Sequence, residues 1–481
     1  MKQPSIRKNY IYNTFYQILS LITPLITAPY LARVLGPDGV GIQSYTASVC
    51  NYFVLFAMLG TASYGQREIA GHRDDKEEVS KIFWQIELIT IGATLVCLLF
   101  WGILILCSHE YREYYIALTF TIIGAALDIS WFFAGFERFN LIVIRNTVIK
   151  LVGIVLIFTF VKAKDDLIVY IVLNALSGMV GQLSMWGYLK SFLVKVEWKK
   201  LRFKEAFQET LVYFLPSIAT SVYTVLDKTM IGLITKNSYE NGYYEQTNKI
   251  VSMGTSIVCS LNTVMSSRMS YLFSQKKYEE IRQKLGKSLD YCVLLSCLLV
   301  GGIFGIAAGF VPWFFGKAYE PVIVLLRVYC PLVFIIAISN CLGGQYLTPS
   351  GQRIRSLKAI ITGSATNFIC NLFLIPNYGA VGAAIASLVA EGVILCMYLY
   401  MSKEYVNFKQ LSQLVIKRGV ACIVMAYAMT KLIAILQYST FSIFLSVGVA
   451  VIIYILCVAI LGDSLLSEIF NGIMRLMKKG K

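Results

Sequence analysis

Apolar runs of about 20 residues recur along the whole chain and are separated by short polar segments. A helix needs about 20 predominantly apolar residues to cross the hydrocarbon core of a bilayer. Fourteen runs meet this requirement, so the pattern predicts an all-α integral membrane protein with 14 transmembrane helices. The first seven run 12–32, 42–62, 82–107, 114–133, 141–160, 167–189 and 211–235. The second seven run 250–273, 289–310, 322–347, 357–375, 379–401, 414–436 and 441–461.

A weak internal repeat divides these helices into two related halves. TPLITAPYLARVLG around Pro24 resembles LPSIATSVYTVLDKTMIG around Pro216, and WFFAGFER at 131–138 matches YLTPSGQR at 346–353. We therefore expect an N-terminal lobe at 1–205 with helices one to six and a C-terminal lobe at 206–402 with helices seven to twelve. Residues 403–481 then add helices thirteen and fourteen and a cytoplasmic tail.

Pro24 and Pro216 stand at equivalent places in the first and seventh predicted helices. Proline removes one backbone hydrogen bond and kinks a helix. Paired interruptions in the two halves of a transporter point to its moving parts, so both prolines are candidate hinges. Ordinary packing prolines are the alternative, because proline is common in membrane helices.

Composition excludes an ordinary soluble protein. The 481 residues are 57% hydrophobic and only 15% charged, with a mean hydropathy of +0.66. A typical soluble domain has about 25% charged residues. Lipid must therefore be the solvent for most of the chain.

The net charge of +16 would suggest nucleic acid binding in a soluble protein, but the positions of the basic residues indicate membrane topology instead. With a cytoplasmic N-terminus, 33 of the 43 Lys and Arg residues lie on the inside and nine lie outside. Basic residues concentrate in cytoplasmic loops of membrane proteins. The asymmetry predicts an even number of helices with both termini cytoplasmic.

Motifs for enzyme chemistry are missing from the sequence. The two histidines form no zinc motif, the 12 cysteines form no CxxC pair, and the run before Gly286, Lys287 and Ser288 lacks the first glycine of a phosphate-binding loop. The short external connections also disfavour a polyprenyl-sugar polymerase, which is the non-transporter alternative. We expect a protein that is not an enzyme and binds no metal or cofactor.

Several segments together resemble the polysaccharide transporter family, which comprises O-antigen, capsule and teichoic-acid repeat-unit flippases. The family lies within the multidrug/oligosaccharidyl-lipid/polysaccharide (MATE-like) superfamily. The segments are LGPDGVG at 35–41, WFFAGFERF at 131–139, DKTMIG at 227–232, GYYEQTNKI at 242–250 and the run from GQRIRSLKAI to ASLVAE at 351–391. The last of these is the most specific.

The resemblance implies two six-helix bundles around a central cavity, followed by two further helices, working by alternating access. The implied substrate is an undecaprenyl-pyrophosphate-linked oligosaccharide, moved from the inner to the outer leaflet of the bacterial cytoplasmic membrane. It also implies coupling to an ion gradient, with a proton or sodium as candidate ions. A polysaccharide polymerase and glycosyltransferases are the expected partners besides membrane lipid.

Charged residues within membrane helices are the candidate site residues, because each costs roughly 2.5–3.5 kcal/mol on insertion scales and needs a partner or water. Lys150 and Arg327 belong to this group of deep charges. The resemblance places helices one, two, seven and eight around the cavity, where cations would meet the pyrophosphate. It thereby selects as substrate-binding residues Arg33, Arg67, Lys228, Lys249 and Arg268.

Four further charges are candidates for ion coupling or for structural contacts. Asp128 and Arg145 have opposite charges at similar depths, which predicts a structural salt bridge. Asp227 is expected to bond to another helix or to titrate during coupling, and Glu391 is a candidate proton or sodium site.

Two transporters of the same fold remain alternatives to a repeat-unit flippase. An ion-coupled multidrug exporter would need an acidic or apolar cavity to attract organic cations. A peptidoglycan-precursor flippase would share the pyrophosphate and the lipid carrier.

Overall fold

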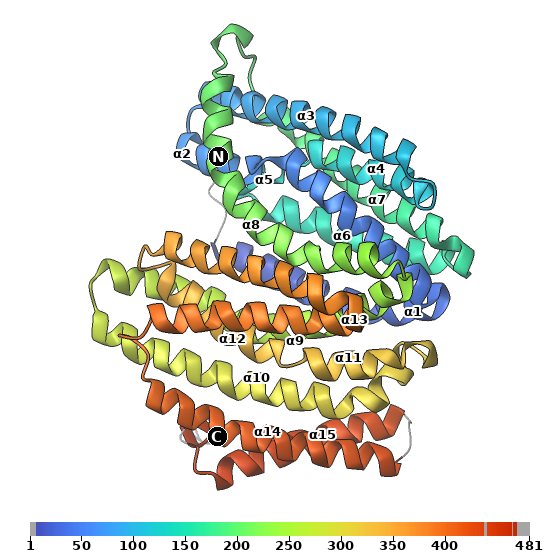
Figure 1. The fold of residues 1–481 in the computed structure, drawn as a ribbon. Helices are drawn as coiled ribbons and strands as arrows, with labels where there is room; N and C mark the ends of the chain where they lie inside the picture. Colours follow the sequence, from blue (N-terminus) through green and yellow to red (C-terminus); the bar gives the residue numbers. More distant parts are fainter. Residues whose placement is uncertain (1–5, 437–439, 464, 469–481) are drawn as a thin grey trace, which may run out of the picture. The chain divides into compact units, whose positions relative to one another are not determined.

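Helices and the turns between them make up the described residues, among which there is no strand (Figure 1). The computed structural model describes residues 6–436, 440–463 and 465–468, without the side chains of 6–14, 200, 215–217, 219–224, 261 and 263–264. The earlier helices are α1 (Ile6–Met58), α2 (Thr61–His72), α3 (Lys76–Cys107), α4 (Arg112–Ala126), α5 (Ser130–Gly135), α6 (Phe139–Phe160), α7 (Leu167–Ser184) and α8 (Phe203–Thr235). The later helices are α9 (Ser238–Ser274), α10 (Tyr278–Phe314), α11 (Pro321–Tyr329), α12 (Leu332–Leu342), α13 (Arg353–Met401), α14 (Phe408–Leu436) and α15 (Thr440–Ile460).

The predicted class, an all-α protein with many membrane spans, is confirmed. Within the described residues, 10 helices are long and apolar enough to cross a membrane, or 11 if one bent pair counts as a span. Large apolar side chains stay exposed on these helices, such as Leu99 on α3 at 70% and Ile423 on α14 at 70%. Exposed apolar area of this kind is stable against lipid but not against water.

Two of the long helices contain a sharp break, and each covers two of the predicted spans. In α1 the break is at Gly36, which has φ 70° and ψ 177°. A positive φ favours glycine, and the following Pro37 disfavours helical dihedrals in the residue before it while suiting the first turn of a new helix. Gly36 and Pro37 therefore end one helix and start the next. Pro24, the predicted hinge, lies within α1 before this break.

α13 is a helical hairpin that turns at Gly379. This glycine has φ 55° and ψ −132°, a backbone conformation that other residues rarely adopt. Contacts then pair the two arms in antiparallel order: Ser356 with Tyr398 at 2.6 Å between hydroxyl oxygens, and Asn367 Nδ2 with Ser387 Oγ at 3.4 Å. The predicted helices 357–375 and 379–401 are thus the two arms of one hairpin.

Gly379→Ala should lower the thermal midpoint of the purified protein. The alanine Cβ is strained at this positive φ, at a cost of about 1–3 kcal/mol. Gly392→Ala on the same hairpin is the matched control, because no atom lies within 4 Å of a Cβ placed there. Fluorescence-detected unfolding in detergent measures both variants, and equal midpoints for the two would contradict the strain at Gly379.

The fourth and tenth predicted spans are interrupted. α4 ends at Ala126 and α5 starts at Ser130, so Asp128 lies in the connection between them. α11 and α12 are separated by Cys330 and Pro331, and α12 continues into the π-helix η5 (Gly343–Leu347). Hydropathy does not detect such breaks, because the flanking residues remain apolar on both sides.

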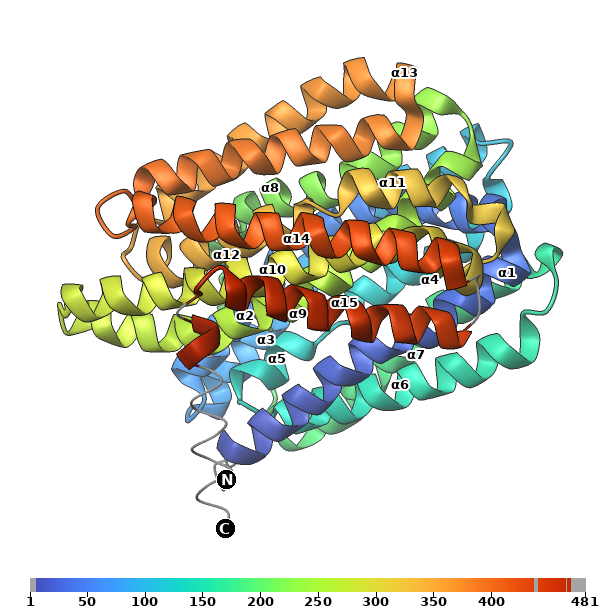
Figure 2. The same cartoon turned by 90° about the horizontal axis from the view of Figure 1, so that it is seen from below.

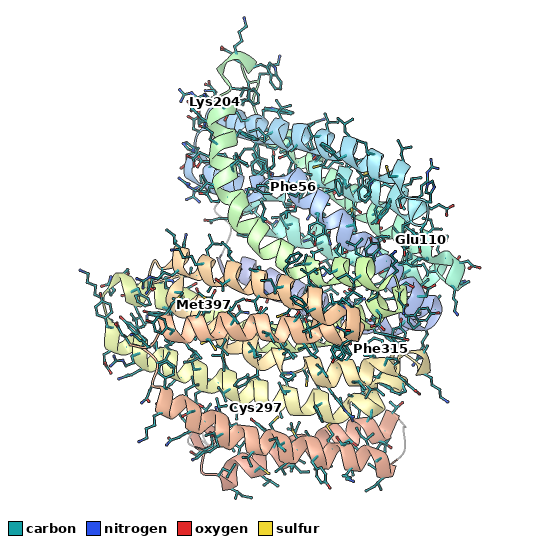
Figure 3. All side chains as sticks on the ribbon, in the orientation of Figure 1. Phe56, Glu110, Lys204, Cys297, Phe315 and Met397 are labelled. Atoms are coloured by element: carbon teal, nitrogen blue, oxygen red, sulfur yellow. The ribbon has the colours of Figure 1, made fainter. Side chains whose placement is uncertain are left out.

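The chain divides into two compact units, residues 1–242 and 243–481. In the first unit, α4 packs on α7 and on α1, and Ile122 and Trp101 lie in its buried core. In the second unit, α10 packs on α14, and α14 pairs with α15 (Figure 2). Figure 3 shows the side chains between these helices, with the buried Cys297 of α10 labelled. The predicted division into lobes at 205 and 206 follows the repeat and stays a prediction.

Candidate functional site

Two cations of α6, Arg145 and Lys150, are the candidate binding groups in the first unit, and we call them the α6 cations. They are five residues apart, so at 100° per residue their side chains leave the helix about 140° apart. Arg145 therefore faces α5 and α7, whereas Lys150 faces α1. Both are half-buried within a helix that is long and apolar enough to span the membrane.

Arg145 is held by uncharged side chains. Its Nη1 donates to Gln182 Oε1 of α7 at 2.6 Å and to Ser130 Oγ at 3.0 Å. Its Nε and Nη2 donate to Asn146 Oδ1 at 3.0 and 2.7 Å. These four bonds leave one of the five guanidinium N–H groups without an acceptor among the described residues.

Asp128 reaches Arg145 only through a hydroxyl group. Asp128 accepts the backbone N–H of Ser130 at 2.9 Å and also the Ser130 hydroxyl. This local turn, typical of Asp, orients Ser130 so that its oxygen accepts from Arg145. In place of the direct salt bridge expected between Asp128 and Arg145, the Ser130 hydroxyl connects the two, because the break between α4 and α5 folds Asp128 back on its own backbone.

Lys150 contacts uncharged groups of α1. Its Nζ donates to Ser20 Oγ at 2.5 Å and lies 4.5 Å from the centroid of the Tyr16 ring. No ion pair with a carboxylate occurs at Lys150 among the residues that the structure describes. A hydroxyl and an aromatic face stabilise a cation only in part, so the positive charge remains available to an anion.

Arg33 and Arg67, predicted to bind substrate, lie on α1 and α2 of the same unit. Arg33 is exposed. Arg67 Nη1 donates to the hydroxyl of Tyr213 on α8 at 2.5 Å, and its Nε lies 3.7 Å from a Glu68 carboxylate oxygen. Its side chain is 63% exposed, which suits a position near a helix end.

Asp227 and Lys228 lie on α8, where Asp227 is 5% exposed and Lys228 is half-buried. The backbone around them is fixed by neighbours. Thr229 Oγ1 lies 2.9 Å from Ser48 Oγ of α1, and the Asn241 side chain, with its amide in the satisfied orientation, donates to the Lys228 carbonyl oxygen at 2.8 Å. Lys228, next to the buried Asp227, thus lies where α8 makes close contacts with α1 and with Asn241 of α9.

Two other predicted substrate-binding residues lie in the second unit, both beside carboxylates. Lys249 Nζ is 3.4 Å from Glu245 Oε1, one turn earlier on α9. Arg268 Nη2 is 3.1 Å from Glu280 Oε1 of α10, and its guanidinium lies over the Tyr271 ring. Both cations differ in this respect from the α6 cations.

Glu391 is half-buried on the second arm of α13. On the first arm, the buried Asn371 Nδ2 donates to Asn367 Oδ1 at 3.0 Å, as expected from their spacing of four residues. The side chain of Pro216, the second predicted hinge, lies outside the described residues, although its backbone belongs to α8.

Two buried charged groups escaped the sequence analysis. Glu87 of α3 is 0% exposed, and neither of its carboxylate oxygens has a hydrogen-bond partner among the described residues. Arg418 of α14 is also fully buried and bonds to Asp290 of α10 and to Asp463 beyond α15. Glu87 and Arg418 each lie in a predicted span or at its edge, where an unusual charge in an apolar run was the available signal.

Comparisons with known proteins fit this architecture. A family model described as polysaccharide biosynthesis protein matches residues 6–273. A protein of Escherichia coli (strain K12) named as an O-antigen transporter is 23% identical over 406 residues, covering 82% of this chain and 96% of the relative. The solved structure of the lipid II flippase MurJ in an inward closed conformation superposes with a TM-score of 0.72 at 14% identity, covering 95% of this chain and 99% of that one. An inward-facing multidrug resistance transporter of the MATE family gives 0.61 at 13% identity, covering 83% and 95%.

Proposed function

Because this chain belongs to the polysaccharide biosynthesis protein family, we propose that it is a flippase for lipid-linked oligosaccharides. It moves undecaprenyl-pyrophosphate-linked repeat units from the inner to the outer leaflet of the bacterial cytoplasmic membrane by alternating access. The name of the E. coli relative, an O-antigen transporter, supports a substrate of this class and a role in transport rather than in catalysis. The many apolar helices support a multi-pass membrane location.

The α6 cations are the observation that carries this proposal. A pyrophosphate concentrates negative charge on a few oxygens, and a cation in a low-dielectric site attracts it strongly. Lys150 and Arg145 are held by a hydroxyl, an aromatic face and amides rather than by direct ion pairs. They can therefore bind a phosphate oxygen without first breaking an ion pair. Cations at these two positions repel organic cations, which disfavours a multidrug exporter.

The remaining expectations complete the proposal. Fourteen spans form two six-helix lobes around a central cavity plus two further helices, with both termini cytoplasmic. Pro24 and Pro216 act as hinges, and a proton or sodium gradient drives the cycle through Asp128, Asp227 or Glu391. Arg33, Arg67, Lys228, Lys249 and Arg268 add contacts to the substrate along its path.

Depletion of the protein in its source bacterium tests the function. Lipid-linked repeat units should accumulate on the cytoplasmic face, since their synthesis continues while their export stops. Their side of the membrane is measured by oxidising exposed sugars with an impermeant reagent in intact and in lysed spheroplasts. Restoration by the wild-type gene is the control. Repeat units that reach the outer face at the normal rate without the protein would contradict flipping.

A further inference from the structure

An apolar groove of about 620 Å³ runs between α6 and α7 in the first unit. The two helices lie side by side in both views (Figures 1 and 2). Its walls include the half-exposed Val148 and Val180. Its floor is formed by Gly181 and Ile149, which pack closely against each other. Leu156 and Leu173 extend its apolar lining along the helices.

One end of the groove is polar. Arg145, Ser184 and Tyr188 line it there, with Tyr188 on the short helix η2 (Met185–Ser191) that follows α7. Arg145 has one guanidinium N–H without an acceptor among the described residues. The Tyr188 hydroxyl, on a side chain that is 52% exposed, also has no hydrogen-bond partner in the described part of the chain.

The groove thus matches an amphipathic ligand with one long apolar chain and one anionic group. Its polar end coincides with the start of α6 and the end of α7, which the basic-residue pattern places on the cytoplasmic side. From that level, the apolar part of the groove extends into the hydrocarbon core. The donors at the polar end, Arg145 and Tyr188, fit a chain that ends in a phosphate.

We propose that this groove binds the polyprenyl chain of the lipid-linked substrate in the cytoplasmic leaflet, with Arg145 and Tyr188 bound to the phosphate that adjoins the chain. The proposal rests on the proposed function and gives the substrate a docking site on the lipid-facing side of α6 and α7. Arg145 would then donate its remaining N–H to a phosphate oxygen, and Tyr188 would donate its hydroxyl to another.

Binding of undecaprenyl monophosphate to the full-length protein in nanodiscs tests the site. Val148→Trp fills the groove and should weaken binding by about 10-fold or more, the equivalent of roughly 1.4 kcal/mol. Leu99→Trp is the matched control, because Leu99 is 70% exposed on α3, outside the groove. Tyr188→Phe removes only the hydroxyl donor to the charged phosphate and should weaken binding by about 10-fold. Thermal midpoints of all variants confirm that they are folded.

Two results would overturn the proposal. One is Val148→Trp binding undecaprenyl monophosphate as tightly as the wild type. The other is equal competition by phosphatidylglycerol, which would identify the occupant as an ordinary anionic phospholipid. Binding is measured without transport, so the two proposals can be separated. A variant that no longer binds undecaprenyl monophosphate but transports repeat units normally would refute the groove as a binding site and leave the proposed function intact. Intact binding without accumulation of repeat units after depletion refutes the proposed function instead.

Discussion

Lys150→Met is expected to reduce transport of lipid-linked repeat units by about 10- to 100-fold, because a hydrogen bond to a charged group is worth about 1.5–3 kcal/mol. Methionine keeps the length and packing of the lysine stem but removes the charge. A lysine within a membrane helix costs roughly 2.5–3.5 kcal/mol on insertion scales, so the variant should insert at least as well as the wild type. The protected fraction of repeat units in spheroplasts measures transport, and immunoblotting of membranes measures insertion.

Lys431→Met is the matched control for this prediction. Lys431 also lies over a tyrosine ring within a membrane helix, 5.7 Å from the centroid of Tyr427 on α14, but it is exposed. Its replacement should leave transport unchanged. Lys150→Arg keeps the positive charge and should retain transport. Wild-type transport by Lys150→Met would remove Lys150 from the substrate path.

Arg418→Met is expected to destabilise the second unit by roughly 3–5 kcal/mol, since removing one partner of a buried ion pair leaves an uncompensated charge. Arg418 is 0% exposed. Its Nε and Nη2 donate to both oxygens of Asp463 at 2.9 and 3.0 Å, and its Nη1 donates to the Asp290 carbonyl oxygen at 2.5 Å. The arginine therefore joins α10, α14 and the segment after α15. A lower thermal midpoint in detergent measures the loss.

Lys287→Met provides the comparison with an exposed ion pair on the same helix as Asp290. Lys287 Nζ lies 2.9 Å from Glu468 Oε1, with side chains 63% and 61% exposed. Surface pairs of this kind contribute about 0–1 kcal/mol, so this variant should unfold close to the wild type. A wild-type midpoint for Arg418→Met would contradict the structural role of the buried cluster.

Hydropathy predicted the helices far better than their breaks. The predicted ends at residues 107 and 160 coincide with the ends of α3 at Cys107 and α6 at Phe160. Length and apolarity determine these spans, and both can be measured along a sequence. The division of the fourth span around Asp128 depends instead on a side chain that hydrogen-bonds to its own backbone, which an average over a window of residues does not detect.

Residue type marks the deep charges in the sequence but does not give their partners. Lys150 belongs to the deep charges visible in the sequence, but the expected cavity helices did not include the fifth span, so it was not selected. Its contact with Ser20 joins residues 130 positions apart and depends on how α6 packs on α1. That Glu87 has no hydrogen-bond partner among the described residues likewise becomes visible only once the neighbouring helices are placed.

The hairpin of α13 has a consequence for how the chain enters the bilayer. Its two arms bury Asn367, Asn371 and Ser387, and Asn367 bonds to Ser387 across the hairpin and to Asn371 on its own arm. An arm that entered alone would expose those amides to hydrocarbon, where an unpaired polar group costs several kcal/mol. The translocon should therefore release residues 353–401 into lipid as one unit, after both arms have been synthesised.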